Sequence, residues 1–81
     1  MDKTSIKIRA ELLADFVKRQ FFSAGYEIAL SLKDRKSGFC TNERVKAARS
    51  AAKFTYSSAK ASGLHKEFLP MMRETVRKYR K

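Results

Sequence analysis

The chain has 81 residues, of which 19 are Lys or Arg and 8 are Asp or Glu, and its formal net charge is +11. A chain of this length is expected to form one domain, residues 1–81, with a small core. A hydrophobic content of 43% with three Gly and one Pro excludes a disordered chain and predicts long helices. No apolar run approaches the roughly 18 residues of a membrane span, so stable membrane insertion is not expected.

The first predicted helix covers about residues 5–24. It places Ile6, Ala10, Leu13, Val17 and Ala24 on one face. Phe22 projects toward the opposite, polar side. Either this helix breaks near Gly25, or Phe22 packs under a neighbouring helix.

A second helical piece is predicted over residues 26–33, and its apolar residues on every side predict burial. A polar connector over residues 34–38 follows and ends in Gly38. Phe39 is expected to return to the core. Cys40 precedes the next helix. The only histidine that could act as its general base, His65, lies about 25 residues away, so a structural cysteine is expected rather than a nucleophile.

The third predicted helix starts after Thr41 or Asn42 and ends near Ser62, where Gly63 is expected to adopt a left-handed stop. Its apolar face consists of Val45, Ala48, Ala52, Thr55 and Ala59, with Ala47, Ala51 and Phe54 at its margin. At about 100° per residue, its bases fall within roughly 60° of one another. These bases are Lys46, Arg49, Lys53 and Lys60.

The last helix is predicted to begin at Pro70, after a short turn over residues 65–69, because proline is tolerated in a first helical turn. Its inner face carries Met72, Val76 and Tyr79, and its outer face carries Arg73, Arg77 and Arg80. The predicted fold is therefore all-α, a compact bundle of three to five helices.

The positive charge is concentrated in the second half of the chain. Residues 44–81 hold eleven bases and two acids, whereas residues 1–43 hold eight bases and six acids. Such an imbalance favours an anionic partner. We expect a small regulatory protein that contacts the phosphate backbone of DNA or RNA, although an ordinary solvated helix face has the same pattern. The predicted nucleic-acid-binding residues are Lys46, Arg49, Lys53, Lys60, Tyr56, Arg73, Arg77 and Arg80.

A protein partner is the main alternative. Phe21, Phe22, Tyr26, Met71 and Met72 are expected to leave exposed apolar surface, and Phe22, Met71 and Met72 are the predicted protein-binding residues. Small accessory proteins of phages, which bind and inhibit or redirect a partner protein, are often of this size. The charge would then steer the chain toward an acidic partner. A homodimer, and a last helix lying on an anionic membrane surface, are further alternatives.

No enzymatic motif is recognisable. His65 has no second ligand at metal-binding spacing, and there is no glycine-rich phosphate loop. We therefore expect no catalytic activity, no metal and no cofactor. The N-terminal residues 1–4 lack the apolar run of a signal peptide, and a single cysteine suits a reducing compartment, so a cytoplasmic location is expected.

Overall fold

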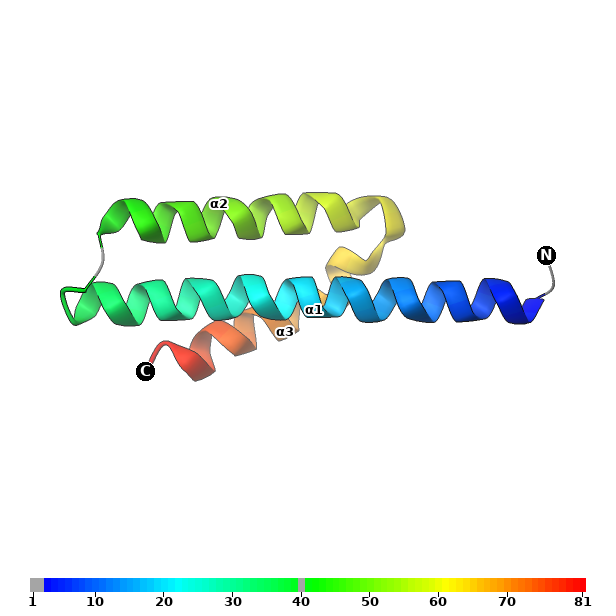
Figure 1. Cartoon of the computed structure of the whole chain (residues 1–81), viewed down its shortest axis with the longest axis horizontal. Coiled ribbons are helices and arrows are strands. Elements are labelled where there is room, and N and C mark those ends of the chain that lie inside the picture. The colour runs from blue at the N-terminus through cyan, green and yellow to red at the C-terminus, as the bar shows by residue number, and fades with distance from the viewer. Residues whose placement is uncertain (1–2, 40) are drawn as a thin grey trace.

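The computed structural model describes residues 3–39 and 41–81, with side chains from Ser5 onward. In this part of the chain, the elements are α1 (Lys3–Lys36), α2 (Asn42–Ala59), the 3₁₀ turn η1 (Lys60–Ser62) and α3 (Leu64–Tyr79). Helix α2 runs antiparallel to α1, and α3 returns in the direction of α1 (Figure 1). The all-α prediction is confirmed. Cys40 lies outside the described residues.

Helix α1 passes through Gly25 without a break, so the predicted separate piece over residues 26–33 is the second half of one long helix. Gly25 is instead the place where α3 crosses closely. A Cβ atom added there would lie 2.8 Å from the carbonyl oxygen of Met72 and 3.2 Å from the Cβ of Thr75. The absence of a side chain therefore lets the two backbones approach.

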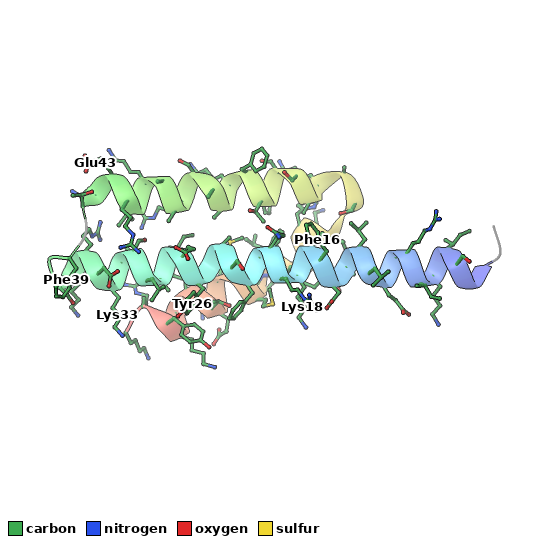
Figure 2. All side chains as sticks on the ribbon, in the orientation of Figure 1. Phe16, Lys18, Tyr26, Lys33, Phe39 and Glu43 are labelled. Atoms are coloured by element: carbon green, nitrogen blue, oxygen red, sulfur yellow. The ribbon has the colours of Figure 1, made fainter. Side chains whose placement is uncertain are left out.

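Phe22 follows the second of the two predicted alternatives, because it packs against a neighbouring helix. Its ring stacks on Tyr26 at a centroid distance of 6.1 Å and meets Tyr79 of α3 edge-on at 6.3 Å. Tyr26 and Tyr79 also meet edge-on, at 5.1 Å. Figure 2 shows Tyr26 on the α3 side of α1. Three aromatic rings thus join the middle of α1 to the end of α3.

Small side chains form the contact between α1 and α2. Val45, Ala52 and Ala59 are buried on α2, and Ala24 and Ser31 are buried on α1. The short side chains let the two helices pack along most of the length of α2 (Figure 1). The predicted inner face of this helix is confirmed at its three buried positions.

Two aromatic residues lie where the sequence analysis did not place them. Phe54 was assigned to the margin of the apolar face but is 74% exposed, at the rim of a hollow that it lines with Leu13 and Phe16 of α1. Phe39 was expected in the core but is 83% exposed. Gly38, at φ 82°, ends α1 with amide hydrogen bonds from Gly38 to Arg35 O and from Phe39 to Asp34 O. This helix stop directs Phe39 outward.

Helix α3 begins at Leu64, six residues before the predicted start at Pro70. The left-handed Gly63 (φ 75°) occurs as predicted, and the helix starts directly after it. Phe68 is buried and meets Phe21 edge-on at 6.1 Å, which anchors the first turns of α3 on α1. Pro70 and Lys66 are both exposed, so water can bind the Lys66 carbonyl that loses its helical partner.

The molecule is elongated, with extents of 54 × 20 × 16 Å and a radius of gyration of 15.0 Å. A compact domain of this length would have a radius of about 12 Å. The difference arises because the N-terminal part of α1 projects past α2 and α3 (Figure 1). Helices α2 and α3 both pack on α1 and make far fewer contacts with each other.

Candidate nucleic-acid interface

Four predicted bases, three on α2 and Lys60 on the following η1, form an exposed row (the α2 row) beside the buried face of α2. Lys46, Arg49, Lys53 and Lys60 are all exposed, at the margin of the face that Val45 and Ala52 bury against α1. In the part of the chain that the structure describes, ion pairs join Arg19 to Asp15, Arg44 to Asp34 and Arg77 to Glu74. None of them involves a base of this row, so no ion pair among the described residues neutralises its charges.

A central hollow of about 560 Å³ joins the row on α2 to α3 across α1. Arg49 and Lys53 stand on its α2 side, and Arg73 stands on its α3 side. These cations are more than twenty residues apart in sequence at their extremes, yet they border one concavity. Its full lining is Ile28, Arg49, Ala52, Lys53, Tyr56, Ser57, Leu69, Met72 and Arg73.

An end hollow of about 680 Å³ lies where α1 and α3 end. Leu32 is its apolar residue, and five bases surround it. They are Arg35, Lys36, Arg77, Arg80 and Lys81. Bases in the last turn of a helix also complement the helix dipole, which accounts for part of this arrangement. Among the described residues that line either hollow, there is no Asp or Glu.

The two hollows follow one another along the molecule. Ile28 and Leu32 are one helical turn apart on α1, and Arg73 and Arg77 are one turn apart on α3. One turn corresponds to about 5.4 Å. We call the central and end hollows together the basic groove.

Arg35 and Lys36 are members of the basic groove that the sequence analysis missed. It assigned them to a polar connector, whereas they form the last turn of α1. The Arg35 guanidinium donates a hydrogen bond to the Asn42 side chain at 3.4 Å, across the turn between α1 and α2. The signal in the sequence was a basic pair that ends two residues before the glycine stop at Gly38. Their position opposite Arg77 and Arg80 depends on the return of α3.

Arg77 is the one predicted nucleic-acid-binding residue that forms an ion pair among the described residues. Its guanidinium lies 3.7 Å from the Glu74 carboxylate, and both side chains are more than 70% exposed. An exposed pair of this kind contributes little and is screened by salt. Arg77 therefore remains able to contact an anion.

Tyr56 is half-buried and borders the central hollow. Its ring meets the His65 ring edge-on at 5.1 Å, and the Lys60 ammonium lies 5.4 Å from the ring centroid. This fixes the position of the aromatic ring beside the basic row. His65 thus has a packing role, and the described residues contain no cluster of three side chains suited to hold a metal.

The predicted protein-binding patch is only partly at the surface. Phe22 is 43% exposed, Met71 is half-buried, and both line a shallow hollow on the side of α1 and α3. The expectation that Met72 and Phe21 are exposed is wrong. Both are buried between α1 and α3, at relative exposures of 6% and 0%. They face the interface because α3 crosses α1 at Gly25.

A larger exposed apolar surface lies on the N-terminal part of α1, and the sequence analysis did not assign it to a site. We call it the apolar overhang; its residues are Ile6, Ile8, Leu12, Leu13 and Phe16, each about half exposed or more. Leu13 and Phe16 also line a hollow with Phe54 at the end of α2. Figure 2 shows Phe16 on the α2 side of α1. The sequence did contain a signal of this surface, because Ile8 and Leu12 are large apolar residues outside the predicted apolar face.

The apolar face of α3, through which the last helix was to lie on a membrane surface, is covered by α1. Met72 is buried, and Val76 and Tyr79 are half-buried against α1. Across the described residues, none of the helices combines the length and the apolar character that crossing a bilayer requires.

No model of a known protein family, no curated protein and no solved structure matches the chain.

Proposed function

We propose that this protein binds DNA or RNA through the phosphate backbone, with the basic groove as the contact surface. The observation that carries the proposal is the gathering of bases from all three helices around two neighbouring hollows whose described lining contains no acid. Cations that neutralise several phosphates release the counterions condensed on the nucleic acid, which drives association. We further propose that the role of this small protein is regulatory, exerted through binding.

The test is the salt dependence of binding to labelled DNA and RNA fragments. If Arg49, Lys53 and Arg73 of the central hollow and one base of the end hollow each neutralise one phosphate, a log–log plot of affinity against salt has a slope of about −3 to −4. Lys53→Glu is expected to weaken binding about tenfold or more at low salt for every sequence, and to make the slope shallower by about one or more.

Lys7→Glu is the matched control. It changes the net charge by the same amount, at an exposed position on the N-terminal part of α1, away from the groove. It is expected to leave affinity within about threefold of the unmodified protein, because charges beyond a Debye length of about 10 Å are screened. Equal loss in the two variants, or affinity no better than millimolar, would contradict the proposal.

A second candidate function, a regulator that captures a partner protein, is favoured by the apolar overhang. Five large apolar side chains are exposed on one helix segment, and clustered exposed apolar residues mark interaction sites. The basic groove would then steer an acidic partner toward the molecule.

Affinity purification after nuclease treatment tests this candidate. We expect one protein to be retained by the unmodified chain and lost with Leu12→Glu, which places a charge in the overhang without touching the core. Light scattering on the purified chain separates a second copy from a different partner. Loss of every bound protein on nuclease treatment would contradict this candidate and favour nucleic acid.

A further inference from the structure

The central hollow combines a cationic border with an apolar floor. Arg49, Lys53 and Arg73 are its charged lining residues, while the others, apart from Ser57, are apolar or aromatic. These floor residues are Ile28, Ala52, Tyr56, Leu69 and Met72. A phosphate backbone gains nothing from apolar surface. The floor therefore calls for a ligand that carries both anionic and flat apolar groups.

We propose that the basic groove takes a single, unpaired strand of DNA or RNA, with its phosphates on the bordering cations and a base against the floor of the central hollow. This inference rests on the proposed function and narrows its ligand. In a duplex the faces of the bases are stacked on one another, so only phosphates, sugars and base edges are offered to a protein. An unpaired strand can turn a base toward an aromatic or apolar surface.

The dimensions of the groove suit a short stretch of backbone. From Leu69 in the central hollow to Arg80 in the end hollow, α3 advances eleven residues, or about 16 Å at 1.5 Å per residue. Arginine and lysine side chains line both sides of this path. Arg73 faces Arg49 and Lys53 across the central hollow, and Arg77 and Arg80 share the end hollow with Arg35 and Lys36. A strand in the groove can thus exchange contacts with cations on either side.

Tyr56 supplies the aromatic surface. It borders the central hollow, and its contact with the His65 ring holds it in place. A pre-positioned ring costs little further entropy when a base packs on it. Phe54, two residues earlier on the same helix, is 74% exposed but lies outside the lining of this hollow. Variants of Tyr56 and Phe54 therefore compare an aromatic ring inside the hollow with one outside it.

The experiment compares three oligonucleotides of equal phosphate number by fluorescence anisotropy: a single strand, the same number of phosphates in a duplex, and a single strand in which the central nucleotides are abasic. Both DNA and RNA forms are measured. We expect the intact single strand to bind about tenfold or more tightly than the other two, since base–aromatic packing is lost in both. Equal affinity for all three, with the salt dependence intact, would overturn the inference but leave the proposed function standing.

Absence of binding to every oligonucleotide at low salt would overturn the proposed function itself. Variants give an independent readout. Tyr56→Ala is expected to remove about tenfold of the preference for the intact strand over the abasic one, while Tyr56→Phe and Phe54→Ala keep it. Circular dichroism checks that each variant is folded. An unchanged preference in folded Tyr56→Ala would overturn the assignment of the base to this hollow.

Discussion

At the scale of single residues, Gly25 decides how closely two helices approach. Glycine inside a helix costs about 1 kcal/mol relative to alanine, so its presence in the middle of the 34-residue α1 needs a reason. The reason is the carbonyl oxygen of Met72, only 2.8 Å from where a Cβ would stand. Because that atom belongs to a helical backbone, a larger side chain must push α3 away.

Gly25→Ala is therefore expected to destabilise the fold by about 1–3 kcal/mol, despite its gain in helix propensity. Urea unfolding followed by circular dichroism measures the change. Ser23→Ala is the control, because Ser23 is exposed two residues earlier on the same helix and gains propensity without a clash. A Gly25→Ala protein more stable than the unmodified chain would show that the two backbones do not approach as described.

At the scale of elements, the start of α3 is the clearest difference between sequence and structure. Proline is common in the first turn of a helix, which predicted a start at Pro70. The structure starts the helix at Leu64, directly after the left-handed Gly63. Burial of Phe68 against Phe21 stabilises the turns before the proline. Tertiary packing has outweighed a local preference here.

Pro70→Ala distinguishes the two starting points. If α3 begins at Leu64, Pro70 lies in the helix interior, and alanine restores an amide that can bond to the Lys66 carbonyl. We expect stabilisation by about 1 kcal/mol or more, since proline in a helix interior costs about 3 kcal/mol. Differential scanning calorimetry measures it as a higher Tm. An unchanged or lower Tm would indicate that the helix begins at the proline.

Helix α2 could be predicted well from the sequence, whereas α1 could not. The period of Val45, Ala52 and Ala59 marks the inner face of α2, and Gly63 marks the end of the η1 turn that follows it. In α1, Gly25 resembled a break because its role depends on a backbone from residue 72, far along the chain. The exposure of Phe54 was equally hidden, because a residue at the margin of an apolar face is covered only where a neighbouring helix extends over it.

At the scale of the whole molecule, the basic side chains gather because α2 and α3 both pack on α1. Helix α1 is the element on which α2 and α3 both pack, and the groove follows from their limited contact with each other. The sequence predicted the row of bases from Lys46 to Lys60 and the arginines at positions 73, 77 and 80. It could not predict that Arg35 and Lys36 join Arg77 and Arg80, because that meeting depends on the path of the chain between them.

The shape of the molecule also separates its two candidate surfaces. The basic groove lies between the helices, while the apolar overhang lies on the N-terminal part of α1, with Leu13 and Phe16 beside the end of α2. The two surfaces differ in charge and in composition. A partner that uses one of them leaves the other largely unchanged, so a map of contacts at residue level identifies which surface is used.

Such a map, by nuclear magnetic resonance of the ¹⁵N-labelled protein titrated with a single-stranded oligonucleotide, tests the central claim most directly. We predict that amide shifts concentrate at Arg49, Lys53, Tyr56 and Arg73 on the two sides of the central hollow, and weaken as salt rises. Shifts confined to Ile8, Leu12 and Phe16 of the overhang, or no shifts at low salt, would contradict it.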